Sequence, residues 1–177
     1  MKKELREVIN KLSTSRRQEV LTMFNSIEHE FMETPASTKY HGNYLGGLFD
    51  HTMNVIKISK VLYATLKPEF TLESLIFCAL VHDIGKIGSK EEPMYNILVN
   101  ASEPGYCEIK YNPRISPNMN HEQWTIYYLM KFKIQVSAGE LFAIINHAGP
   151  YTQWKTETPL QLMLHSADNL SAKVSNL

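Results

Sequence analysis

The sequence predicts an all-α fold with one non-helical insertion, and three observations lead to this prediction. Apolar residues recur at spacings of three and four along most of the chain. Capping residues and prolines mark the ends of these periodic segments. Only residues 88–119 lack the helical period, and they hold four prolines and an alternating apolar pattern instead. Because 177 residues can bury one large core, we expect a single domain over residues 1–177, with residues 1–35 as a helical extension packed on it.

The helices expected in the first half follow from apolar spacing and from their end signals. The first spans residues 13–32 and ends before Pro35. The second spans residues 48–66, ahead of Pro68. Thr71 is the expected N-cap of a third helix, and apolar residues on all its sides indicate a position in the centre of the bundle.

The second half begins with the insertion at residues 88–119, which we expect to form a lid or a hairpin. Three helices should follow it, over residues 120–132, 137–147 and 158–173. Asn120 is the expected N-cap of the first of these. Ser137 and Glu140 have the spacing of a capping box for the second, which should end close to His147.

Composition excludes several classes of protein. Eighteen basic residues balance eighteen acidic ones, so we expect no duplex DNA binding. No stretch approaches the roughly 18 apolar residues of a membrane span, and we expect no membrane partner. Cys78 and Cys107 form no CxxC pair, which is typical of reduced thiols. These features favour a cytoplasmic protein.

The residues that indicate chemistry are histidines and aspartates. Seven histidines occur, and four of them lie on or at the ends of different expected helices. His82 and Asp83 are adjacent at the end of the buried third helix, where an isolated carboxylate would be costly to desolvate. A bound cation removes that cost, and imidazole with carboxylate suits Mn, Fe, Co, Ni or Zn.

Three motifs occur in a specific order: GGLFDHT around His51, HDIGK from His82 to Lys86, and HSADNLSAK around Asp168. This order of His, His-Asp and Asp resembles the HD superfamily of metal-dependent phosphohydrolases. The resemblance covers residues 40–173. It is strongest to the branch that includes the HD domain of bacterial 3′-to-5′ exoribonucleases, and it implies an HD-domain helical bundle.

The resemblance also implies a set of metal ligands, taken position by position. Four residues correspond to the ligands of a first divalent metal: His51, His82, Asp83 and Asp168. His121 and His147 correspond to ligands of a second metal, with Asp83 as the bridging carboxylate. We therefore expect two divalent metals, Mn²⁺ or Fe²⁺ first, with Mg²⁺, Co²⁺, Ni²⁺ and Zn²⁺ as alternatives. Asn146 stands where the family often has a further histidine, which implies a weaker second site.

The expected catalytic residues are Asp83, Lys86 and Asp168. Four residues are candidates for substrate binding: Lys86, His41, Arg114 and Tyr111. Some of these positions have simpler interpretations. His121 could be a solvated residue of a first helical turn, His147 could interact with a helix dipole, and His41 could be a turn residue.

By resemblance, the expected reaction is hydrolysis of a nucleotide phosphoester or phosphodiester by a metal-activated hydroxide. The resembling branch usually carries an accessory nucleic-acid-binding domain, for which 177 residues leave no room. We therefore expect a small nucleotide, a cyclic nucleotide or a short oligonucleotide as substrate. An HD-type di-iron oxygenase and a non-hydrolytic nucleotide-binding module are the alternatives, and a homo-oligomer stays open.

Overall fold

The computed structural model describes residues 1–99, 107–114, 119–148 and 158–174. The described residues form an all-α bundle with one small hairpin, which confirms the expected fold class. Its helices are α1 (Lys3–Ile9), α2 (Thr14–Ser26), α3 (Glu28–Glu33), α4 (Gly47–Leu66), α5 (Leu72–Val81), α6 (His121–Lys131), α7 (Ala138–Ile145) and α8 (Pro159–Val174). A short 3₁₀ helix, η1 (Ile84–Ile87), follows α5, and the hairpin consists of β1 (Tyr95–Val99) and β2 (Cys107–Tyr111).

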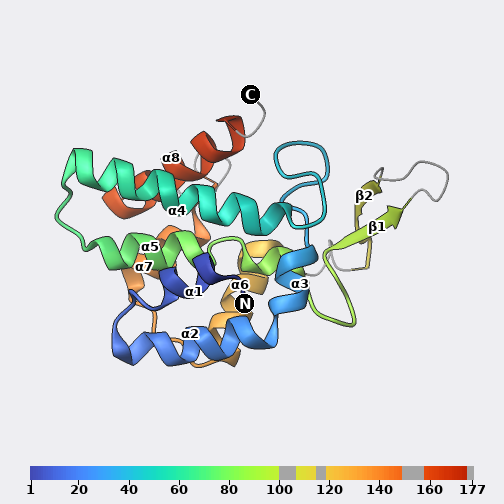
Figure 1. Ribbon diagram of the computed structural model, residues 1–177, viewed down its shortest axis with the longest axis horizontal. Helices are drawn as coiled ribbons and strands as arrows, with labels where there is room; N and C mark the ends of the chain where they lie inside the picture. Colours follow the sequence, from blue (N-terminus) through green and yellow to red (C-terminus); the bar gives the residue numbers. More distant parts are fainter. Residues whose placement is uncertain (100–106, 115–118, 149–157, 175–177) are drawn as a thin grey trace.

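The long helix α4 packs between two other helices of the bundle (Figure 1). It packs against α8 on one side and α5 on the other, while η1 packs against α6. The hairpin extends from the end of the bundle where α3 and the start of α4 lie. None of the described helices is long and apolar enough to cross a bilayer.

One core joins the N-terminal helices to the rest of the bundle. Its fully buried side chains include Leu5, Phe24, Leu48, Phe77 and Leu164, which come from five different helices. Every residue from Leu75 to Val81 in α5 is buried, as the apolar character of this helix predicted. The residues that follow α5 therefore begin in the centre of the molecule.

Two features of the N-terminal region differ from the expectation. Residues 3–9 form the unpredicted helix α1, which buries Leu5, Val8 and Ile9 at helical spacing. The single helix expected over residues 13–32 is divided at Ile27, whose φ of −117° is not helical. The hydroxyl of Ser26 donates to the Met23 carbonyl at 2.8 Å, and such side-chain hydrogen bonds compete with the helical ladder.

The hairpin lies within the expected insertion. Its antiparallel register pairs Tyr95 with Tyr111 and Ile97 with Ile109. Tyr95 and Ile109 are buried in a small cluster of their own beside the main core. The hydroxyl of Tyr128 in α6 donates to the Gly88 carbonyl at 2.6 Å and holds the base of the insertion on the bundle.

Candidate metal centre

The fold brings the six residues expected as metal ligands together around Asp83. They come from five separate places: His51 from α4, His82 and Asp83 from the end of α5, His121 from the first turn of α6, His147 from the end of α7, and Asp168 from α8. Four of the six are buried, and Asp168 and His121 are half-buried.

One group of side chains lies against atom Oδ2 of Asp83. The Nε2 atoms of His51 and His82 are 3.5 and 3.4 Å from this oxygen. Oδ1 of Asp168 joins the same group, at 2.9 Å from Nε2 of His51 and 3.9 Å from Nε2 of His82. This group offers two imidazole nitrogens and two carboxylate oxygens.

A second group lies against the other oxygen of Asp83. The Nε2 atoms of His121 and His147 are 3.4 and 3.5 Å from Oδ1. The two oxygens of one carboxylate thus face two different pairs of histidines. Asp83 is the residue that the two groups share.

Local backbone geometry orients the histidines. Nδ1 of His82 lies 2.9 Å from the Ala79 carbonyl, and Nδ1 of His147 lies 2.7 Å from the Ile144 carbonyl. Each carbonyl belongs to the last helical turn, three residues earlier in the chain. Because a carbonyl can only accept, Nδ1 carries the proton, and the lone pair of a neutral ring is on Nε2, which faces Asp83. Both histidines are therefore set up as Nε2 ligands.

The turn that carries Asp83 is anchored to α6. The Gly85 amide donates to the Thr125 hydroxyl at 3.0 Å, and that hydroxyl donates to the His82 carbonyl at 3.2 Å. A Cβ atom at Gly85 would overlap with the His121 carbonyl oxygen and lie 2.6 Å from the Thr125 amide nitrogen. This close approach requires glycine, and it places His121 beside Asp83.

The two carboxylates of the site are ionised. Burial by itself would raise the pKa of Asp83, but the Lys86 ammonium at 2.6 Å and the neighbouring imidazoles hold it well below its usual value. Burial also opposes ionisation of Asp168, yet its contact with His51 lowers the pKa of that carboxyl. Burial alone would lower the pKa of Lys86, but its ion pair with Asp83 outweighs burial and raises this pKa.

The histidines differ in charge when the site holds only protein atoms. Burial lowers the pKa of His51, and it lowers the pKa of His121 to about 3 despite the nearby Asp83. Burial alone would also lower the pKa of His147, but contact with the Asp83 carboxylate outweighs burial and raises this pKa to about 9. Neutral imidazoles at His51 and His121 are the form that binds metals.

The donor set fits a divalent cation. Nε2 of His82 and Oδ1 of Asp83 are buried, and neither makes a hydrogen bond within the described residues. Such orphaned atoms are costly unless a partner satisfies them. Neutral imidazole together with ionised carboxylate suits Mn, Fe, Co, Ni and Zn, so the clusters around Asp83 could hold a divalent metal.

The residues expected to bind substrate have different positions. Lys86 contacts Asp83 directly. The ring of His41 lies 4.5 Å from that of His51, and burial is the main cause that lowers the pKa of His41 to about 4. Tyr111 is exposed and lines a cavity of about 210 Å³ next to His121. Arg114 is exposed in the turn after β2. The roles of these four residues stay predictions.

Two residues near the site were missed in the sequence. Oε1 of Glu122 lies 3.3 Å from Nε2 of His121, and Glu122 could form a donor group with His121 and His147. The position of Glu122 directly after His121 in the sequence is the signal that could have identified it as a further candidate ligand. The Ser171 hydroxyl lies 3.2 Å from Nδ1 of His51, a contact between α8 and α4 that no local pattern indicates.

Two comparisons with known proteins found a match. A family model described as the HD domain matches residues 48–173. The chain is similar to the 3′-5′ exoribonuclease YhaM of Bacillus subtilis (strain 168), with 26% identity over 161 residues. This alignment covers 84% of the chain and 45% of the relative, so the chain spans less than half of that protein's length. No solved structure gives a significant match.

Proposed function

The chain belongs to the HD-domain family, and on this premise we propose that it is a metal-dependent phosphohydrolase that cleaves a phosphoester or phosphodiester of a nucleotide or short oligonucleotide. The observation that carries the proposal is the position of Asp83. Its two oxygens face two separate pairs of histidines, as the bridging ligand of a two-metal centre would.

The proposed ligand sets share this carboxylate. His51, His82 and Asp168 would complete the set on Oδ2, and His121 and His147 the set on Oδ1. We propose two divalent cations, with Mn²⁺ or Fe²⁺ as the first choices because imidazole and carboxylate donors suit both. When bound, such a pair lowers the pKa of a water molecule and offsets charge on the phosphate oxygens.

The protein's own contribution is positioning and charge. Asp83 and Asp168 remain ionised inside the bundle and hold the imidazoles toward one point. Lys86 places an ammonium at the edge of this centre, where it can donate to a phosphate oxygen of the substrate. A buried site also limits the access of bulk water to the reacting phosphate, which strengthens these interactions.

The similarity to an exoribonuclease supports a nucleotide or RNA end as the substrate. At 26% identity this similarity supports the class of bond more than the exact substrate. A panel of substrates is therefore the direct test. We propose 5′-nucleotides, cyclic mononucleotides, cyclic dinucleotides and oligonucleotides of two to six residues.

The experiment uses the full chain, freed of metal with a chelator and reloaded with Mn²⁺ or, without oxygen, Fe²⁺. Chromatography of the products identifies the bond that is cut. Asp83→Asn should remove all metal and all turnover, measured by elemental analysis and product formation. Glu69→Gln, the same kind of carboxylate-to-amide change at an exposed residue between α4 and α5, is the matched control and should keep both.

His147→Ala tests the number of metals separately. We expect the bound metal to fall from two ions to one per chain, with turnover at least 100-fold lower. Unchanged stoichiometry would contradict a second site. Full turnover in Asp83→Asn would contradict the assignment of the centre. Oxygen consumption by the iron-loaded protein without phosphate release would instead indicate an oxygenase, and selective nucleotide binding without either reaction would indicate a binding module.

A further inference from the structure

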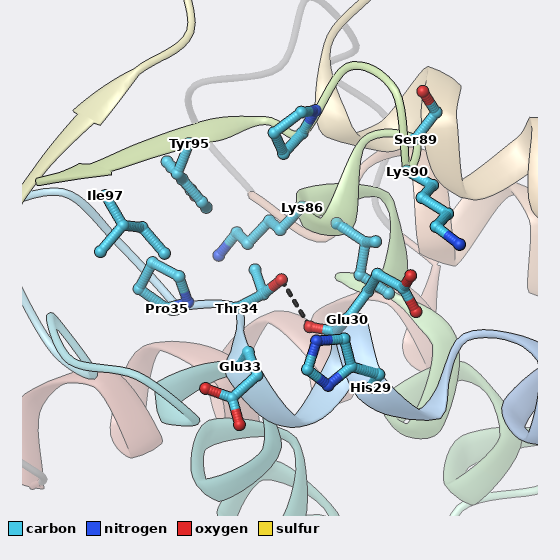
Figure 2. A pocket seen from close by; sticks show the side chains of 12 residues that line it. His29, Glu30, Glu33, Thr34, Pro35, Lys86, Ser89, Lys90, Tyr95 and Ile97 are labelled. Carbon is cyan, nitrogen blue, oxygen red and sulfur yellow. Dashed lines mark hydrogen bonds between the residues drawn. The ribbon is translucent and has the colours of Figure 1, made fainter.

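A cavity of about 330 Å³ is lined in part by Lys86, the residue that contacts Asp83 of the candidate metal centre (Figure 2). Its lining comes from two parts of the chain that are far apart in sequence, namely residues 29–35 and residues 86–97. Residues 29–35 precede the region that the HD-domain model matches. The cavity is therefore built jointly by the N-terminal region and by the base of the hairpin.

Lys86 belongs to both the cavity and the metal centre. Figure 2 shows its side chain extending between Tyr95 on one side and Thr34 on the other. Its Nζ atom lies 2.6 Å from Oδ2 of Asp83. The cavity is therefore a space beside Lys86 that the ester group of a phosphate bound at the metal centre could enter.

The inner walls are mainly apolar. Tyr95 and Pro35 are buried and Ile97 is half-buried, and these three side chains line the cavity with one aromatic ring and two aliphatic surfaces. A volume of about 330 Å³ is at the lower end of the roughly 300–1,000 Å³ typical of small-molecule sites. Such walls favour a flat, partly apolar group.

The charges of the lining limit what else can enter. Apart from Lys86, the described lining has one lysine, Lys90, and two carboxylates, Glu30 and Glu33. The carboxylates can accept hydrogen bonds from hydroxyl or amino groups, and they repel a second phosphate. The ligand that fits has one anionic end at Lys86 and an uncharged body with hydrogen-bond donors.

We propose that this cavity binds one nucleoside of the substrate, its base against the apolar wall and its phosphate at the metal centre. The inference rests on the proposed function for the position of the phosphate. It adds that the base is recognised, so a sugar phosphate without a base is a poor ligand. It also assigns a binding role to residues 29–35 at the N-terminal side.

The test measures binding of nucleotides by titration calorimetry to the full chain loaded with Mn²⁺. The probes are 5′-AMP, 3′-AMP and ribose 5-phosphate. We expect the better of the two nucleotides to bind at least tenfold more tightly than ribose 5-phosphate. Equal affinities for nucleotide and sugar phosphate would overturn the inference.

Two neighbouring substitutions on β1 provide a matched pair. Ile97→Asp places a carboxylate in the cavity and should reduce nucleotide affinity about tenfold, to the level of ribose 5-phosphate. Leu98→Asp places the same group on the opposite face of the strand, where the side chain is 55% exposed, and should leave affinity unchanged. Equal losses in the two variants would count against the cavity.

A gain of affinity provides evidence that does not depend on the stability of the hairpin. Glu33→Lys replaces an exposed carboxylate at the rim with an ammonium. We expect adenosine 3′,5′-bisphosphate to bind at least threefold more tightly to this variant than to the wild type, with little change for ribose 5-phosphate. Unchanged bisphosphate affinity would contradict the predicted position of the nucleoside.

Hydrolysis of bis(p-nitrophenyl) phosphate separates this inference from the proposed function, because that ester has no nucleoside. Metal-dependent hydrolysis of this ester without selectivity for nucleotides would contradict only the nucleoside subsite. Selectivity for nucleotides without any hydrolysis would contradict only the hydrolase.

Discussion

The Lys86 ammonium donates to Oδ2 of Asp83 across 2.6 Å, on the side of the carboxylate that His51 and His82 also face. Asp83 is buried, and Lys86 supplies a full positive charge to balance it. The same ammonium would lie next to any cation bound by this oxygen. Lys86 therefore has opposite effects on the metal-free protein and on metal binding.

Lys86→Met should separate these two effects. Removing the ammonium leaves the Asp83 carboxylate without its ion-pair partner, so the metal-free protein should melt at a lower temperature. The affinity for Mn²⁺ should rise about tenfold, roughly 1.4 kcal/mol, because a repulsive charge is removed. Inhibition by inorganic phosphate should weaken. Calorimetric titration with Mn²⁺ checks the affinity, and weaker metal binding by the variant would contradict this account.

Ser171→Ala should weaken metal binding without altering any proposed ligand. The Ser171 hydroxyl lies 3.2 Å from Nδ1 of His51, and such outer contacts orient a ligating histidine. We expect a loss of about 10- to 100-fold in Mn²⁺ affinity, the usual range for removal of an outer-shell partner. Ser166→Ala, an exposed change on the same helix, should bind Mn²⁺ like the wild type and serves as the control.

Gly85→Ala should damage both stability and the metal centre. An added Cβ would overlap with the His121 carbonyl and push α6 away from η1. We expect a loss of about 2–3 kcal/mol in the free energy of unfolding, as for overpacked sites, together with weaker metal binding. Chemical denaturation and metal titration measure the two effects.

Gly139→Ala is the matched glycine change for that experiment. Gly139 lies in the first turn of α7, and nothing lies within 4 Å of an added Cβ. Because alanine has the higher helix propensity, we expect a gain of up to about 1 kcal/mol in the free energy of unfolding. A comparable loss of stability in both variants would show that the contact with His121 is not the cause.

Glu140→Gln tests an ion pair at the opposite end of α7 from His147. Two hydrogen bonds of 2.9 and 3.0 Å join the Glu140 carboxylate to Arg16 and tie α7 to α2. Burial alone would raise the pKa of Glu140, but Arg16 and Ser137 outweigh it and lower the pKa below its ordinary value of 4.5. We expect the variant to lose about 3 kcal/mol of unfolding free energy at pH 7, as for a broken buried pair.

The pH dependence of this loss follows from the direction of the shift. A carboxyl whose pKa is lower in the folded state contributes its stability fully above the unfolded pKa, and loses it as the pH falls through the folded pKa. The difference between wild type and Glu140→Gln should thus be constant above about pH 6 and shrink below pH 4.5. Denaturation curves between pH 3 and 8 check this. A difference that grows toward acid would contradict the assignment.

The sequence by itself determined most of the helical elements and the identity of the candidate ligands. Thr71 and Asn120 cap their helices, and Ser137 forms a capping box with Glu140, as their local spacing predicted. Asn120 also forms a capping box with Gln123, which was not predicted. Helix caps can be predicted from sequence because a capping side chain bonds to a residue only two or three positions away. The unpredicted helix α1 and the division at Ile27 show where local signals were too weak to decide.

Only the tertiary structure decided which oxygen of Asp83 each histidine faces, and that Ser171 and Glu122 lie beside those histidines. It also decided that residues 29–35 and the base of the hairpin enclose one cavity at Lys86. Hydrogen-bonded caps and apolar periods act within a few residues, whereas these contacts join helices separated by up to 120 residues. Their geometry depends on how α4, α5, α6 and α8 pack, which no short stretch of sequence encodes.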